Sequence, residues 1–117
     1  MKHLISLFFL FVVSTFVSSQ EITKQSFIGK WCGQWDGIYS LCLTIDSVEK
    51  NAIAKYQWLE HKNGKFKRSD KKIKRINRNT LKIDNIYLVL NANKVNQAGA
   101  FGIFKQQSRT AVLIKEN

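Results

Sequence analysis

The 117-residue sequence contains no proline and only two histidines, His3 and His61. It has two cysteines, Cys32 and Cys42, and 8 acidic residues against 19 basic ones. These shortages disfavour several kinds of site, since a zinc centre needs three or four nitrogen or sulfur ligands. A serine or cysteine nucleophile needs a histidine base that a third group orients, and beyond residue 19 only His61 is available. We therefore expect no metal and no other cofactor.

Glu60 and His61 form the one candidate acid/base pair, and beside many cations they would suit a small secreted ribonuclease, a class that is often basic. Neighbouring residues in a strand point to opposite faces, so the two side chains converge on one phosphate only if the strand ends before them. The acidic residues sit mostly alone in turns, which does not favour the paired carboxylates of a glycosidase. We expect a protein without catalytic residues.

The first 19 residues have the pattern of a secretory signal peptide, with a positive start, an apolar stretch over 4–17 and small residues at 17–19. An uncleaved anchor is the alternative, but the apolar stretch is shorter than the ~20 residues that span a bilayer. No second apolar run of that length follows. We expect a signal peptide over 1–19 and a single secreted or periplasmic domain over 20–117.

The segment 27–45 predicts a β-hairpin. A three-residue turn at residues 36–38 pairs Trp35 with Tyr39 and Cys32 with Cys42. Because side chains alternate across a strand, this register places the apolar residues on one face and both cysteines on the other. Export into an oxidising compartment then favours a structural disulfide between Cys32 and Cys42. Free thiols, or half of a metal site, are the alternatives.

Short runs of strand-forming residues recur along the rest of the chain, each bounded by turn residues. They predict eight strands, at 27–35, 39–48, 52–60, 65–76, 80–83, 86–90, 97–105 and 109–115. Asn63 and Gly64 predict a two-residue hairpin turn, 91–96 a polar loop and 106–108 the last turn. We expect an all-β antiparallel meander that closes, or nearly closes, into a small barrel, because closure removes unpaired edges. A two-sheet sandwich would need a long crossover connection.

An eight-stranded barrel is just wide enough to be filled by side chains or to hold one small ligand. The residues expected to point inward are Phe27, Trp31, Trp35, Tyr56, Trp58, Leu81, Ile83, Phe101, Ile103, Ala111 and Leu113. Aromatic residues among them, with Tyr39, would either fill the core or line a pocket for a lipid or a sugar. The candidate pocket residues are Trp31, Trp35, Tyr39, Tyr56, Trp58 and Phe101.

The net charge of +11 is concentrated in one segment, where nine of the 17 residues from 62 to 78 are basic and Asp70 alone opposes them. Such a cluster attracts polysaccharides, phospholipid head groups or nucleic acid. Only Phe66 is placed to stack on a base, and export separates the chain from most nucleic acid, so we do not expect that partner. A solvated pair of strands is the alternative. The candidate anion-binding residues are Lys65, Lys67, Arg68, Lys71, Lys72, Lys74, Arg75 and Arg78.

Gly29-Lys30-Trp31 on the first strand resembles the GxW opening of lipocalins and avidins, the calycin group. From WCGQW at 31–35, through YQW at 56–58 and AGAFG at 98–102, to the closing RTAVLIK, the chain is similar to an exported bacterial β-domain of uncharacterised function. The first resemblance covers one strand and implies a barrel that binds a small ligand in its interior. The second covers most of residues 20–117 and implies no chemistry.

Two functions of different classes follow from the sequence. The first is a non-enzymatic secreted or periplasmic barrel that binds an anionic partner through a basic face. The alternative is a calycin-type carrier of a small apolar or sugar ligand in the barrel interior.

Overall fold

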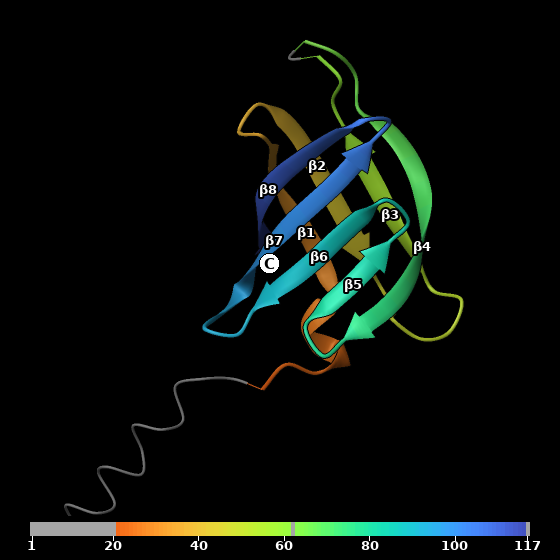
Figure 1. The fold of residues 1–117 in the computed structure, drawn as a ribbon, viewed down its shortest axis with the longest axis vertical. Helices are drawn as coiled ribbons and strands as arrows, with labels where there is room; N and C mark the ends of the chain where they lie inside the picture. The colour runs from red at the N-terminus through yellow and green to blue at the C-terminus, as the bar shows by residue number, and fades with distance from the viewer. Residues whose placement is uncertain (1–20, 62, 117) are drawn as a thin grey trace, which may run out of the picture.

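The computed structural model describes residues 21–61 and 63–116, so the predicted signal peptide lies outside the described residues. Eight strands form one closed antiparallel barrel in sequence order, with β8 paired to β1 (Figure 1). A short 3₁₀ turn, η2 (Lys24–Phe27), precedes them. The strands are β1 (Gly29–Trp35), β2 (Tyr39–Ile45), β3 (Ile53–Trp58), β4 (Lys67–Asn77), β5 (Thr80–Ile83), β6 (Ile86–Asn91), β7 (Lys94–Phe104) and β8 (Gln107–Glu116). The predicted fold class is confirmed.

The β1–β2 hairpin has the predicted register. Trp35 pairs with Tyr39, Trp31 with Leu43 and Gly29 with Ile45 across the turn at 36–38. Trp31, Leu41, Leu43 and Ile45 are almost completely buried, while Lys30, Gln34 and Asp46 on the other side are exposed. Alternation of side chains along both strands therefore separates core from surface as the sequence predicted.

Cys32 and Cys42 are paired across this hairpin and form a disulfide, as predicted. Their Cα atoms are 4.1 Å apart, slightly closer than the range of about 4.4 to 6.8 Å usual for disulfides. Both residues belong to the outward-facing set of the two strands and are only partly buried. The bond therefore links β1 to β2 from outside the barrel and takes no space from the core.

The barrel core is continuous from β1 round to β8. Trp31 is fully buried, and its indole Nε1 donates a hydrogen bond of 3.0 Å to the Phe27 backbone oxygen. Phe27 of η2 is also fully buried, so it joins the core at the end where β1 begins. Among the described residues every buried side-chain nitrogen or oxygen has a hydrogen-bond partner, as a well-packed interior requires.

The last hairpin differs from the predicted one. Phe104 pairs with Gln107, so a two-residue turn connects β7 to β8 in place of the predicted turn at 106–108. Changing a turn by one residue moves alternate side chains of a strand to the other face. Phe101 and Ile103, predicted to point inward, are in fact exposed, while Ala98, Ala100 and Gly102 face the core. The inward prediction is wrong for these two residues and right for Leu113.

Crowding inside the barrel explains the inward face of β7. A Cβ atom placed on Gly102 would lie 2.5 Å from the Phe104 ring and 3.0 Å from Trp35. The ring centroids of Trp35 and Phe104 are 5.3 Å apart in an edge-to-face arrangement. The two rings already occupy the volume beside Gly102, so only small residues of β7 fit there.

Two other connections also differ from their predictions. The β3–β4 ladder ends at the pair Trp58–Lys67, so Asn63 and Gly64 do not form a two-residue hairpin. After Trp58 the chain bonds to β2 instead, because the Leu59 N–H donates to the Ser40 oxygen at 3.0 Å. The predicted polar loop at 91–96 is a tight turn between β6 and β7, with a register shift after residue 90.

No helix in the part of the chain that the structure describes has both the length and the apolar character needed to cross a membrane.

Candidate functional site

The barrel has a pocket of about 360 Å³ at the end that carries the β1–β2, β3–β4, β5–β6 and β7–β8 connections. We call it the mouth pocket. It is lined by Trp35, Tyr39, Tyr56, Trp58, Leu59, Glu60, Lys71, Phe104 and Arg109. Trp35 and Tyr39, two of the candidate pocket residues, flank the β1–β2 turn at this end, and both line the pocket.

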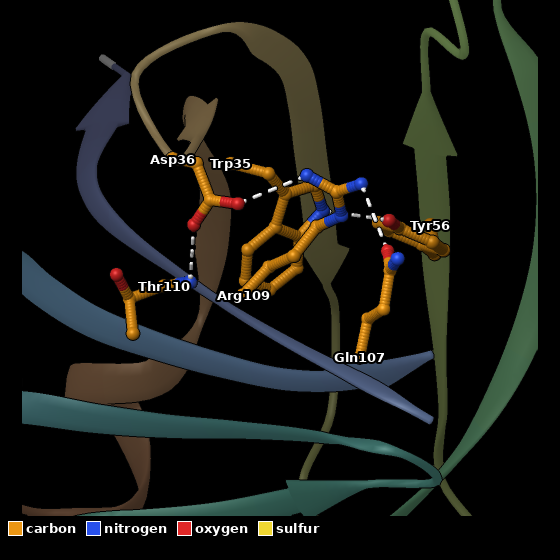
Figure 2. Close-up of polar contacts among 6 residues, drawn as sticks. All are labelled: Trp35, Asp36, Tyr56, Gln107, Arg109 and Thr110. Carbon is orange, nitrogen blue, oxygen red and sulfur yellow. Dashed lines mark hydrogen bonds and ion pairs between the residues drawn. The ribbon is translucent and has the colours of Figure 1, made fainter. Parts of the chain in front are cut away.

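The floor of the mouth pocket is aromatic. The Trp35 indole Nε1 donates a hydrogen bond of 2.8 Å to the Tyr56 hydroxyl, and both side chains are almost fully buried (Figure 2). Tyr56 stacks on Trp58 with ring centroids 4.8 Å apart. Residues of two strands, β1 and β3, thus hold these rings in one arrangement, which presents flat apolar surface to any molecule entering the barrel.

Burial of Tyr56 also changes its acidity. Removal from water raises the pKa of the Tyr56 hydroxyl to about 12, although the hydrogen bond from Trp35 and the charge of Arg109 act in the opposite direction. The hydroxyl therefore stays protonated at physiological pH. It accepts from Trp35 and keeps its own proton for donation within the pocket.

Arg109 of β8 forms one wall, and Asp36 of the β1–β2 turn positions it. The guanidinium Nη1 lies 2.9 Å from Asp36 Oδ2, and Nη2 donates to Gln107 Oε1 at 3.4 Å (Figure 2). Asp36 Oδ1 accepts the Thr110 backbone N–H at 3.1 Å. The guanidinium carbon also lies 4.9 Å from the centre of the Tyr39 ring, within cation–π range. Asp36 therefore both neutralises Arg109 and orients it.

Lys71 supplies a second cation from β4. Its Nζ donates to Asn85 Oδ1 at 3.1 Å and lies 5.7 Å from the centre of the Tyr56 ring. Asn85 is itself held in place, because its Nδ2 donates to the Ile103 oxygen at 2.8 Å. Within residues 21–61 and 63–116 no carboxylate forms an ion pair with Lys71. The half-buried ammonium group is therefore the uncompensated charge of the pocket.

Glu60 is the acidic residue of the pocket lining, and Lys67 neutralises it. Lys67 Nζ lies 2.8 Å from Glu60 Oε2, and this hydrogen bond lowers the pKa of the Glu60 carboxyl. His61 does not share the pocket, since it lines a separate recess with Gln34 and Ser40. Although β3 has ended before them, Glu60 and His61 do not converge on one cavity. The geometry gives no support to the ribonuclease hypothesis.

Four of the six aromatic residues predicted for a ligand pocket line the mouth pocket: Trp35, Tyr39, Tyr56 and Trp58. Trp31 is fully buried in the core, and Phe101 is 41% exposed on the outer surface of β7. Sequence reasoning did not find Phe104 or Arg109. The small residues at 98, 100 and 102 mark one face of β7, the face that also carries Phe104, but alternation alone does not show that this face points inward. No pattern in the sequence around Arg109 indicates that it contacts Asp36, which lies 73 residues away in the chain.

The basic segment is divided between the two faces of β4. Arg68, Lys72 and Lys74 are exposed, whereas Lys71 and Arg75 alternate with them and are half-buried. Lys65 and Arg78 lie outside the strand and are exposed, and Lys67 pairs with Glu60. These residues therefore do not share one face, and their binding of an anion stays a prediction.

The structure supplies outward-facing basic neighbours that the sequence analysis did not include. Lys55 of β3 pairs with Asp70, and Lys82 of β5 pairs with Lys74. The outer surface of β3–β5 thus carries a group that we call the basic face: Lys55, Arg68, Lys72, Lys74 and Lys82.

Cys32, Cys42 and Glu116 lie close enough together to suggest a metal site. Both sulfurs belong to the disulfide, however, and a cysteine ligates metal as its thiolate. With the disulfide intact, this group does not provide a zinc-type donor set.

No protein-family model, curated protein or solved structure matches this chain. The resemblances to the calycin group and to an exported β-domain accordingly stay predictions. The described residues define the protein as a disulfide-linked, closed eight-stranded antiparallel barrel with an aromatic pocket at one end.

Proposed function

We propose that this protein is an exported, non-enzymatic barrel that binds a small amphiphilic anion in the mouth pocket. The observation that carries the proposal is the half-buried ammonium group of Lys71, which has no carboxylate partner and faces an aromatic cavity. A partly buried cation without a carboxylate partner attracts an anionic ligand. The pocket volume of about 360 Å³ lies at the lower end of the range of about 300 to 1,000 Å³ for small-molecule sites.

The ligand class follows from the lining of the pocket. Trp35, Trp58 and Phe104 favour an apolar or planar body, and Lys71 favours a carboxylate or similar group. A medium-chain fatty acid has this chemistry, whereas an uncharged sugar would use the rings alone. Two further features support the proposal: small-ligand binding is what the GxW resemblance implies, and a structural disulfide is typical of exported proteins.

Calorimetric titration with octanoate and with its neutral analogue octanamide tests the proposal. We expect octanoate to bind at least tenfold more tightly than octanamide, because only octanoate brings a charge to Lys71. Lys71→Met keeps an apolar stem of similar length and should abolish that preference. Lys72→Met is the matched control, since Lys72 is the next residue on the exposed face of the same strand. Unchanged octanoate binding by Lys71→Met, or no binding of either probe, would overturn the proposal.

A second function, binding of an anionic surface, is favoured by the basic face. Its five cations are exposed on adjacent strands. Two exposed acidic residues lie beside them: Asp70, opposite Lys55, and Asp84, whose Oδ2 accepts the Lys72 backbone N–H at 3.2 Å. We expect retention on heparin that falls sharply between about 50 and 500 mM salt, because exposed charges are strongly screened at the higher concentration. Lys72→Glu with Lys74→Glu should weaken retention, and retention that is insensitive to both changes would exclude this function.

A further inference from the structure

The outer surface of β6, β7 and β8 is unusually apolar for a chain with so many charges. Val89, Phe101, Ile103, Val112 and Ile114 all point outward, with exposed fractions between 41% and 58%. Strand register brings them together, because Tyr87 lies opposite Phe101 and Gly99 lies opposite both Val89 and Val112. We call this group, with Tyr87, the apolar face.

Gly99 opens the centre of the apolar face. A Cβ atom on Gly99 would meet nothing within 4 Å. The backbone at Gly99 is therefore uncovered between the neighbouring outward-facing side chains. On the described segments 87–89, 97–103 and 110–114, the outward-facing positions carry no charged side chain. A continuous exposed apolar surface of this kind is typical of an interaction site.

The apolar face borders the basic face directly. In the strand register Lys74 lies opposite Lys82, Lys82 opposite Tyr87, and Tyr87 opposite Phe101. The strands that carry the two faces, β3 to β8, follow one another round the barrel, and the two faces meet where β5 adjoins β6 (Figure 1). Lys82, and Lys74 beside it, therefore lie along one edge of an uncharged apolar surface.

We propose that the apolar face docks onto an anionic phospholipid bilayer, with its side chains in the head-group region and the adjoining lysines, Lys82 and Lys74, near the lipid phosphates. Charge complementarity argues for this occupant, because peripheral membrane binding combines buried apolar surface with attraction to anionic lipids. If a second copy of the chain covered the apolar face, the lysines beside that face in each copy would approach one another, and two proteins of net charge +11 would repel. The inference rests on the second proposed function, since the basic face supplies the electrostatic attraction.

Sedimentation with vesicles tests the docking surface. The disulfide-bonded protein is mixed, at about 100 mM salt, with vesicles of phosphatidylcholine alone or with added phosphatidylglycerol. We expect binding to the mixed vesicles. Phe101→Ser with Val112→Ser should reduce it at least tenfold, because both side chains lie in the apolar face. Ile38→Ser with Ile53→Ser is the matched control, since these residues are similarly exposed, at 49% and 52%, but lie outside that face.

Substitution of lysines distinguishes docking by the apolar face from anion binding by the basic face, the function on which the inference rests. Lys74→Gln with Lys82→Gln should reduce binding to the mixed vesicles about 10- to 30-fold, at roughly fivefold for each lysine near the surface. The matched control is Lys24→Gln with Lys50→Gln, at exposed positions outside the strands. If the lysine variant loses binding while Phe101→Ser with Val112→Ser binds normally, the basic face still functions but the apolar face does not dock.

A direct readout of insertion uses Phe101→Trp, whose fluorescence should be quenched by lipids brominated on the acyl chains. Unquenched fluorescence on bound vesicles would overturn the inference. A dimer in solution that Phe101→Ser with Val112→Ser dissociates would also overturn it, because a second copy would then cover the apolar face. Thermal unfolding of each variant confirms that an exposed substitution has left the barrel folded.

Discussion

Asp36 and Arg109 are 73 residues apart in the sequence and form an ion pair of 2.9 Å at the mouth of the barrel. The pair joins the β1–β2 turn to β8, next to the place where the barrel closes. Beyond it, the Asp36 N–H donates to the Thr110 oxygen at 2.7 Å, so backbone and side chain together tie the turn to β8.

Two substitutions of Asp36 should have different effects. Asp36→Ala removes the acceptor of the Thr110 N–H and places alanine at a φ of 53°, so we expect a loss of about 2 kcal/mol of unfolding free energy. Asp36→Asn keeps the acceptor and tolerates that φ, and it loses only a partly exposed ion pair worth roughly 0.2 to 1 kcal/mol. Urea unfolding of both variants measures the difference, and equal losses would contradict the role of the Thr110 bond.

Removal of the disulfide should destabilise the barrel without altering the mouth pocket. Cys32→Ser with Cys42→Ser frees a loop of sequence separation 10, and we expect a loss of about 2 to 4 kcal/mol. Octanoate affinity of the folded variant should not change, because the bond lies outside the barrel. Alkylation before and after reduction measures the bond itself, and thiols that react without reduction would show that it does not form.

Two glycines of β7 provide a matched pair for testing the inward face. Gly102→Ala forces the Phe104 ring to move, and we expect a loss of about 1 to 3 kcal/mol and a changed Trp35 emission. Gly99→Ala faces open space and should leave stability unchanged or raise it by up to about 1 kcal/mol, since glycine weakens a strand. Thermal unfolding of both variants measures the two changes in stability. A larger loss of stability for Gly99→Ala than for Gly102→Ala would mean that the inward and outward faces of β7 are assigned the wrong way round.

The raised pKa of Tyr56 predicts a loss of stability in strong base. In the unfolded chain the Tyr56 hydroxyl has the ordinary tyrosine pKa of 10.0, whereas in the folded chain its pKa is raised to about 12. Below pH 10 the stabilisation is fully present, and it is lost as pH rises from 10 to 12, on the order of 2 to 3 kcal/mol in all.

Tyr56→Phe cannot ionise and isolates this effect. At neutral pH the variant should be less stable than the parent by about 1 to 3 kcal/mol, because the buried Trp35 indole N–H loses its acceptor. The difference between the two proteins should then shrink between pH 10 and pH 12. Urea unfolding across that range measures it, and a constant difference would show that the Tyr56 pKa is not raised.

The β1–β2 hairpin could be predicted in full because its determinants are local. A short turn and strict alternation of apolar and polar residues specify one register, and that register brings Cys32 opposite Cys42. The β7–β8 hairpin could not, because both faces of β7 over residues 98–104 consist of apolar or small residues. Alternation alone then permits either face to point inward, and a one-residue error in the turn misplaced Phe101 and Ile103.

The candidate site was predicted in part. Period-two alternation already separates Lys71 from Lys72 in the sequence, yet only the closed barrel shows that the Lys71 side holds the mouth pocket. Arg109 had no local signal, since its position depends on Asp36 in a distant turn. Contacts between residues so far apart depend on how the strands close, which no short window of sequence encodes.

The sequence by itself determined the strand content, the register and disulfide of the first hairpin, and a large positive charge, because each follows from residues close together in the chain. Only the tertiary structure decided which face of β7 points inward and which cation enters the pocket. The physical reason is competition for the interior volume. Once Trp35 and Phe104 fill the space beside Gly102, Phe101 and Ile103 of β7 must face outward, where they become part of the apolar face.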